Sequence, residues 1–189
     1  MCVVDYDKIN NSFDECLFNK ISFDEDIMKT CAFTGHRPEK LPWNNNESDE
    51  RFSTLKEKLK TAIKQAIDNG YLNFLSGMAR GIDMLAAELV LDFKKRYKQI
   101  KLYCIIFYDN HDKNWSLEDK KRHSNILSQC DKKIVLAKKY CPACIENGNR
   151  FLVNNSSHLI AVWNGKPSET KNTIEIAKEQ NKNIQIILI

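Results

Sequence analysis

The sequence predicts an α/β fold, with a mostly parallel β-sheet flanked by helices on both faces. Short apolar runs alternate with longer segments whose apolar residues recur at helical spacing. This alternation is typical of parallel strands joined by right-handed helical crossovers. The run over residues 100–107 is almost continuously apolar, as expected of a strand buried on both faces. Three of the six glycines lie at or just past the ends of predicted strands, where such a sheet has its loops.

Length and composition favour one globular domain. The chain has 189 residues, of which 42% are hydrophobic and 29% charged, and this excludes a largely disordered chain. No apolar run approaches the roughly 20 residues that a membrane helix needs. The N-terminal 29 residues contain no apolar segment of the kind found in secretory signals. We therefore expect a cytoplasmic protein with no membrane partner.

Each predicted strand is a short apolar run bounded by turn residues. The first run ends at Gly35 and is followed by His36-Arg37-Pro38, which reads as a loop. The predicted strands cover residues 30–35, 72–76, 100–107, 133–137, 158–163 and 184–189.

The helices are predicted from apolar residues that recur every three or four positions. Phe52, Leu55, Leu59 and Ile63 show this spacing, and Asn69-Gly70 ends the segment with a helix stop signal. Later segments have the same pattern on one face. The predicted helices cover residues 50–69, 82–93, 117–130, 144–156 and 168–180.

Charged residues are distributed unevenly along the chain. The net charge of the whole chain is +4, whereas residues 1–28 carry seven acidic and two basic side chains, a net −5, and the remainder carries +9. We therefore divide the chain into an acidic N-terminal extension, residues 1–29, and a folded domain, residues 30–189. The basic excess of the domain suits an anionic ligand, although lysines on solvated helix faces give the same excess.

The cysteines do not predict a disulfide framework. Cys141 and Cys144 have C-x-x-C spacing, but the four histidines are scattered and no second pair completes a zinc site. We expect reduced thiols, an unligated pair of loop cysteines, and neither a metal nor a cofactor. The seven cysteines are residues 2, 16, 31, 104, 130, 141 and 144.

The glycines mark a candidate ligand site. Gly35, Gly77 and Gly165 follow strands, and Gly81 begins the helix after the second strand. In open parallel sheets, ligands bind outside the carboxyl ends of the strands. Strand-to-helix turns often contain glycine anyway, so one such residue is uninformative, but several at one edge favour a cleft.

Residues 76–83 predict a phosphate-binding loop between a strand and a helix. Glycines allow the backbone to approach an anion, and free N–H groups at a helix start favour phosphate. Arg80 adds a guanidinium suited to phosphate oxygens, and Asp83 either caps the helix or accepts hydrogen bonds from ribose hydroxyls. The candidate ligand-binding residues in this loop are Ser76, Gly77, Met78, Ala79, Arg80, Gly81 and Asp83.

Three motifs together resemble the YpsA-like family of the SLOG (Smf/DprA–Lonely Guy) superfamily. The first is Phe33-Thr-Gly-His-Arg-Pro38 with Leu41 and Trp43, the second is residues 76–88, and the third is residues 160–166 with Thr173, Ile174 and Ala177. The resemblance covers residues 30–189. It implies a Rossmann-like domain, a site for nucleotide-derived ligands such as ADP-ribose, and a homodimer.

The resemblance adds candidate ligand-binding residues outside the phosphate loop. His36 is expected to contact the ligand or act as an acid or base, and its alternative role is to cap the adjacent turn. The added residues are Gly35, His36, Arg37, Asn149, Asn164, Gly165, Ser168, Glu169 and Thr170.

Several positions depart from the family pattern. Ser168-Glu169-Thr170 stands where the family has Gly-Gly-Thr, so Glu169 would repel a phosphate unless Lys166 or Lys171 pairs with it. Gly148-Asn149 replaces an Arg-Asn pair. Asn154 replaces an aspartate, and His111 replaces a glutamine in the loop after the third strand. These departures concern chemistry, because the apolar pattern of the fold is intact.

Three functions are compatible with these residues. The first is binding, that is, sensing or sequestering, of a nucleotide-derived small molecule such as ADP-ribose or a cyclic or dinucleotide relative. Trp43, Trp115 and Trp163 are candidates for stacking on the base, with core packing as the alternative for each.

The second function is an N-glycoside hydrolase acting on nucleoside monophosphates. Lonely Guy enzymes place a glutamate shortly after the motif threonine, where this chain has Asn172 and Thr173, so we favour a binding protein over an enzyme and assign no catalytic residue. The third is single-stranded DNA binding through the basic runs 94–98 and 120–123. Because lysines are common on the solvent-exposed faces of helices, these runs alone do not indicate nucleic-acid binding, and we do not expect a nucleic-acid partner.

Overall fold

The computed structural model describes residues 23–44 and 46–189. Most of the predicted acidic extension, residues 1–22 with Cys2 and Cys16, lies outside the described residues. In the described part of the chain, six strands form one sheet in the order β4-β3-β2-β1-β5-β6, and every neighbouring pair is parallel. The strands are β1 (Thr30–Gly35), β2 (Asn73–Ser76), β3 (Lys101–Ile106), β4 (Lys132–Val135), β5 (His158–Trp163) and β6 (Asn183–Leu188).

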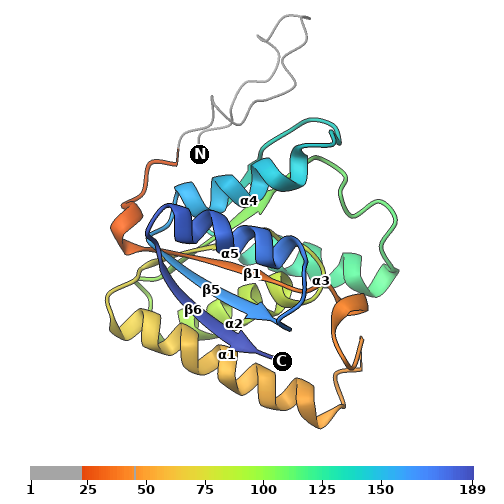
Figure 1. The fold of residues 1–189 in the computed structure, drawn as a ribbon, viewed down its shortest axis with the longest axis horizontal. Coiled ribbons are helices and arrows are strands. Elements are labelled where there is room, and N and C mark those ends of the chain that lie inside the picture. Colours follow the sequence, from red (N-terminus) through yellow and green to blue (C-terminus); the bar gives the residue numbers. More distant parts are fainter. Residues whose placement is uncertain (1–22, 45) are drawn as a thin grey trace, which may run out of the picture.

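Helices cover both faces of this sheet. The apolar sides of the first three helices pack into one core cluster with residues such as Phe33 and Phe74, and the last two pack into a second cluster with Leu75 and Ile105. Figure 1 shows α4 and α5 on the opposite side of the sheet from α1 and α2. The helices are α1 (Glu50–Asp68), α2 (Ile82–Arg96), α3 (Leu117–Gln129), α4 (Cys144–Asn154) and α5 (Glu169–Glu179).

Side chains in the sequence set the helix ends. Asp49 caps α1 by accepting a hydrogen bond from Arg51 N, and Ser116 caps α3 by accepting from Asp119 N. Gly70, with φ +88°, turns the chain after α1. Helix α2 continues to Arg96, beyond the predicted end at residue 93, and basic side chains in its last turn favour this extension because they oppose the negative end of the helix dipole.

The strand order creates a crevice at the carboxyl edge of the sheet. The chain first runs from β1 through β2 and β3 to β4, then returns through α4 to place β5 on the other side of β1. The loops that follow β1 and β5 therefore lead to helices on opposite faces. A ligand crevice forms at such a switch point in open α/β sheets.

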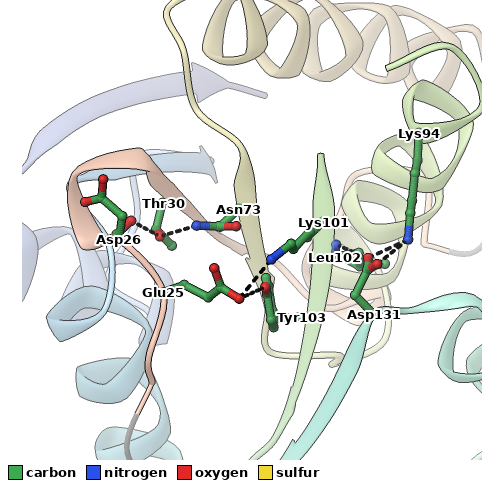
Figure 2. Close-up of polar contacts among 9 residues, drawn as sticks. All are labelled: Glu25, Asp26, Thr30, Asn73, Lys94, Lys101, Leu102, Tyr103 and Asp131. Carbon is green, nitrogen blue, oxygen red and sulfur yellow. Dashed lines mark hydrogen bonds and ion pairs between the residues drawn. The ribbon is translucent and has the colours of Figure 1, made fainter. Parts of the chain in front are cut away.

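At the opposite edge of the sheet, polar contacts fix the segment before β1 (Figure 2). The Glu25 carboxylate accepts a hydrogen bond of 2.5 Å from Tyr103 Oη and pairs with Lys101 Nζ at 3.1 Å. Thr30 Oγ1 donates to Asp26 O at 2.7 Å. These contacts hold the described end of the acidic extension to β3, which is remote in the sequence.

No helix in the described ranges combines the length and the apolar character required to cross a membrane.

Candidate functional site

A cleft of about 770 Å³ lies at the carboxyl edge of the sheet, within the size range of small-molecule sites. The loops after β1, β2, β3 and β5, together with one face of α4 and the first turn of α5, form its walls. A second hollow of about 900 Å³ runs along α1 and the exposed edge of β6. We favour the first as the functional site, because several loops and cationic side chains from distant parts of the sequence converge there.

The cleft gathers most of the residues predicted as ligand contacts. Ser76, Met78, Gly81 and Gly165 do not line it, although they belong to the loops that do. The predicted residues on its walls are Gly35, His36, Arg37, Gly77, Ala79, Arg80, Asp83, Asn149, Asn164, Ser168, Glu169 and Thr170.

The loop between β2 and α2 is held by its own hydrogen bonds. Ser76 Oγ accepts from Met78 N at 3.2 Å and donates to Asp83 O at 2.9 Å. Met78 has φ +55°, is fully buried and does not line the cleft, so it shapes the loop from beneath. The residues of this loop with positive φ are Met78 and Gly81.

Gly77 makes room for protein atoms. A Cβ at this position would lie 2.9 Å from Asp83 Oδ2 and 3.0 Å from Phe107 Cζ. Gly81 has a similar role at the start of α2, since its Cβ would lie 2.6 Å from His36 O. Gly77 therefore lets its loop pack against the start of α2 and against Phe107, and Gly81 lets the same loop pack against the loop after β1. Gly77 also lines the cleft, so the anion contact suggested by the sequence stays a prediction.

Asp83 presents a buried carboxyl group to the cleft. Its side chain is in the first turn of α2, and Oδ2 accepts one long hydrogen bond, 3.4 Å, from Ala79 N. Burial with so little hydrogen bonding raises the pKa of this carboxyl to about 7. Asp83 is therefore partly protonated near neutral pH and can either donate or accept a hydrogen bond.

Arg80 is already engaged by protein groups. It forms an ion pair with Glu39, lies 3.6 Å from Asp119 Oδ2, and stacks at 5.9 Å from the centroid of Trp115. Among the described residues, Arg37, Lys40 and Lys166 also line the cleft and have no carboxylate within ion-pair distance. An anion in the cleft would meet these three cations directly and would compete with Glu39 for Arg80.

His36 connects two loops of the cleft. Its Nε2 accepts a hydrogen bond from Asn164 N at 3.2 Å, and its main-chain oxygen accepts from Ile82 N at 3.3 Å. Burial lowers the pKa of the imidazole, which favours the neutral acceptor form at Nε2. His36 therefore positions the loops after β1 and β5 and presents its remaining surface to the cleft.

The loop after β5 and the start of α5 form the other wall. Trp163 Nε1 donates to Lys166 O at 2.7 Å, and Ser168 caps α5 by accepting from Lys171 N. Glu169 lines the cleft, but no described lysine lies within ion-pair distance of it, so the pairing with Lys166 or Lys171 considered from the sequence is not formed. Its negative charge would disfavour an anion at this end of the cleft relative to the end lined by Arg37 and Lys40.

The loop after β3 contributes aromatic side chains that the sequence only partly indicated. Tyr108, His111 and Trp115 line the cleft, with the His111 ring 5.1 Å from Trp115. Of the three tryptophans proposed for stacking, Trp43 is in the core and Trp163 does not line the cleft, so only Trp115 remains. For Tyr108 and His111, the signal available in the sequence was their position in the loop after the third predicted strand.

Cys141 and Cys144 form a disulfide, which corrects the expectation of two reduced thiols. The bridge closes the turn before α4. Ile145, the residue after Cys144, lines the cleft. The sequence could not show this, because C-x-x-C spacing does not distinguish a bridge from free thiols. Nowhere in ranges 23–44 and 46–189 do three His, Cys, Asp or Glu side chains gather as a metal site would require.

The comparisons with known proteins agree with this architecture. The YpsA family model, described as the YspA SLOG family, matches residues 31–189. UPF0398 protein YpsA of Bacillus subtilis (strain 168) is 25% identical over 160 residues, covering 82% of this chain and 88% of the relative. The uncharacterized SPbeta prophage-derived protein YoqJ of the same strain is 31% identical over 139 residues, covering 66% and 81%.

Two solved structures share the fold. DNA processing protein A from Streptococcus pneumoniae matches with a TM-score of 0.56 and 17% identity, over 90% of this chain and 51% of that protein. The Helicobacter pylori protein of the same name, described with its single-stranded DNA binding mode, matches with a TM-score of 0.57 and 16% identity, over 90% and 66%. The chain thus spans about half of the first and just under two thirds of the second.

These neighbours correct one expectation. We did not expect a nucleic-acid partner, and this expectation is wrong, because the structures that share the fold are DNA processing proteins and one of them binds single-stranded DNA. Single-stranded DNA is therefore retained as a candidate ligand. The family match spans almost all of the described chain and the three motifs converge on one sheet edge, and we conclude that the chain belongs to the YspA SLOG family.

Proposed function

We propose that the cleft binds a nucleotide-derived anion, such as ADP-ribose or a cyclic or dinucleotide relative. The observation that carries this proposal is the convergence of Arg37, Lys40 and Lys166 with the first turns of α2 and α5 around one cleft. No side chain caps α2, so its N-terminus adds a favourable field for phosphate. Tyr108 and Trp115 supply the ring faces that a base requires.

A nucleotide panel in a thermal unfolding assay tests the proposal. A ligand at 100 times its dissociation constant adds about 2.7 kcal/mol to the free energy of unfolding, which gives a clear rise in melting temperature. Arg37→Ala should remove most of the shift. Arg150→Ala, a matched change at an arginine paired with Glu146 outside the cleft, should keep it. If no nucleotide in the panel raises the melting temperature at millimolar concentration, the proposal is wrong.

We expect this binding to occur with slow turnover or none. The cleft carboxylates are Glu39, which is paired with Arg80, the buried Asp83, and Glu169. At the positions where a Lonely Guy glutamate would lie, Asn172 is exposed and Thr173 is buried, with Oγ1 donating to Glu169 O. Chromatography after long incubation with AMP checks this. Release of adenine at about 1 s⁻¹, an ordinary enzymatic rate, would favour the hydrolase.

A second candidate function is single-stranded DNA binding, favoured by the shared fold of the DNA processing proteins. Carboxylates pair with only part of the basic runs named from the sequence: Lys94 pairs with Asp131, and Arg122 pairs with Glu88 and Glu47. We place the DNA contact at the cleft rim, where Arg37, Lys40 and Lys166 converge. Fluorescence anisotropy with labelled oligothymidine at several salt concentrations tests this, since phosphate contacts give affinity that falls steeply with salt.

A further inference from the structure

The Cys141–Cys144 disulfide has the environment of a reactive pair. Cys144 is fully buried as the first residue of α4, whereas Cys141 is partly exposed in the preceding turn. Pro142 and Ala143 between them are exposed. Of the two cysteines, only Cys141 is therefore exposed to an incoming thiol.

The site can stabilise the sulfur that would leave. Cys144 Sγ accepts a hydrogen bond of 3.0 Å from Cys141 N, and no side chain caps the N-terminus of α4, on which this sulfur lies. Main-chain N–H groups and the helix dipole both favour a thiolate there. Lys139 O lies 3.6 Å from the same sulfur and would accept the S–H of the protonated thiol. Hydrogen-bond partners thus exist for both forms of Cys144.

The other described cysteines do not have this arrangement. Cys31 and Cys104 are buried within the sheet, and burial raises the pKa of the Cys31 thiol, which makes it unreactive. Cys130 is partly exposed at the end of α3 and is free. A hydrogen bond with Cys104 lowers the pKa of its thiol, so Cys130 serves as an internal control for a partly exposed thiol outside the C-x-x-C pair.

We propose that Cys141 and Cys144 form a reversible redox site at which a low-molecular-weight thiol opens the disulfide by attack on Cys141. The attacking thiolate forms a bond to Cys141 Sγ, the Sγ–Sγ bond breaks, and Cys144 leaves as a thiolate that takes a proton from water. A second thiolate attacks the external sulfur of the mixed disulfide, which releases the oxidised thiol and leaves Cys141 as a thiolate. The two thiols are oxidised, and the protein disulfide accepts the two electrons.

Glutathione tests the proposal on the full native protein. Samples are equilibrated in reduced and oxidised glutathione mixtures, quenched with acid, alkylated, and mapped by mass spectrometry of the peptide that contains residues 141–144. We expect the pair to be reduced by millimolar reduced glutathione and re-formed by the oxidised form, while circular dichroism shows a folded protein. A disulfide that opens only in denaturant would overturn the proposal and leave a structural bridge.

Single substitutions identify the attacked sulfur. Cys144→Ser should accumulate glutathione on Cys141, because the thiol that would displace it is gone. Cys141→Ser should leave Cys144 at least tenfold less labelled, because this sulfur is buried. Cys130→Ser should not change either result. Equal labelling of the two variants, or slower labelling of Cys141 than of Cys130, would contradict the assignment. The glutathione equilibration of the unmodified protein decides the question if a variant does not fold.

Discussion

Arg80 illustrates how a side chain can be engaged before a ligand arrives. Glu39, Asp119 and the Trp115 ring surround its guanidinium, so an anion must compete with Glu39 to use it. Charge-assisted hydrogen bonds contribute about 1.5–3 kcal/mol, and the exposure of Glu39 reduces what its own pairing contributes.

A pair of substitutions tests this competition. Arg80→Ala should weaken binding of ADP-ribose by roughly 10- to 100-fold, whereas Glu39→Gln should tighten it by freeing the guanidinium. In the double variant the effect of Glu39→Gln should disappear, since it acts through Arg80. Isothermal titration calorimetry on the four proteins gives the cycle. If Glu39→Gln has the same effect with and without Arg80, the two residues act independently.

Asp83 predicts a pH dependence of binding. Its carboxyl has a pKa of about 7 in the fold, so it is neutral below that pH and negative above it. A negative charge close to bound phosphate costs on the order of 1–2 kcal/mol at an effective dielectric of 20, so ADP-ribose affinity should fall as pH rises from 6 to 8.5. Asp83→Asn should flatten the profile. ADP-ribose suits the experiment because its bridging phosphates do not titrate there.

The same group affects stability with a definite sign. The folded pKa of Asp83 lies above its ordinary value of 3.8, so the fold loses stability as pH rises from about 4 to about 7. Asp83→Asn should therefore gain stability relative to the parent protein between pH 5 and pH 8. Urea unfolding at the two pH values provides the check, and a constant difference between the proteins would show that Asp83 ionises normally in the fold.

At the scale of elements, the junction between the loop after β1 and the start of α2 depends on close backbone contact. Gly81 has φ +88°, and Ile82 N donates to His36 O directly beside it. This contact joins two of the family motifs, residues 33–38 and 76–88, at one point. Ser76 does not line the cleft, but its hydrogen bonds with Met78 N and Asp83 O shape the loop that leads to this junction.

Gly81→Ala should reduce the free energy of unfolding by well over 1 kcal/mol, because it adds both a left-handed strain and a Cβ at 2.6 Å from His36 O. Gly70→Ala is a matched control, since Gly70 has the same φ of +88° but no atom within 4 Å of its Cβ position. It should lose only about 1 kcal/mol. Equal losses in chemical unfolding would show that the contact with His36 contributes nothing.

At the scale of the whole molecule, Glu25 in the segment before β1 is held to the start of β3, at the far edge of the sheet. Hydrogen bonds from Tyr103 and Lys101 hold the pKa of Glu25 below its ordinary value of 4.5. Because the folded pKa is lowered, Glu25 stabilises the fold above pH 4.5 and this contribution is lost as pH falls through the folded pKa. The homodimer expected from the resemblance stays a prediction.

Glu25→Gln should destabilise the fold at pH 7 by about 0.5–1 kcal/mol, a value that allows for solvent screening of this partly exposed pair. The difference should shrink toward zero at pH 3, where Glu25 is protonated in the parent protein. Lys101→Met separates the ion pair from the Tyr103 hydrogen bond and should have the smaller effect. Thermal unfolding at the two pH values measures both, and an undiminished difference at pH 3 would contradict the charge argument.

The amino-acid sequence determined the order and type of the elements and the edge at which the site lies. Apolar periodicity, caps such as Asp49 and the Asn69-Gly70 stop are local signals, and they gave β1 and β5 with the bounds found in the structure. The alternation of strands and helices also implied the parallel sheet and the cleft at its carboxyl edge. Local chemistry therefore accounts for most of the architecture.

The tertiary structure decided what the candidate residues contact, because those partners are remote in the sequence. The pairing of Arg80 with Glu39, the hydrogen bond between His36 and Asn164, and the burial that raises the Asp83 pKa all depend on how loops meet. The Cys141–Cys144 bridge also required geometry, since spacing alone fits free and bonded thiols equally. Sequence motifs can indicate where a site lies, but the charge, tautomer and accessibility of its side chains depend on neighbours that only the folded chain brings together.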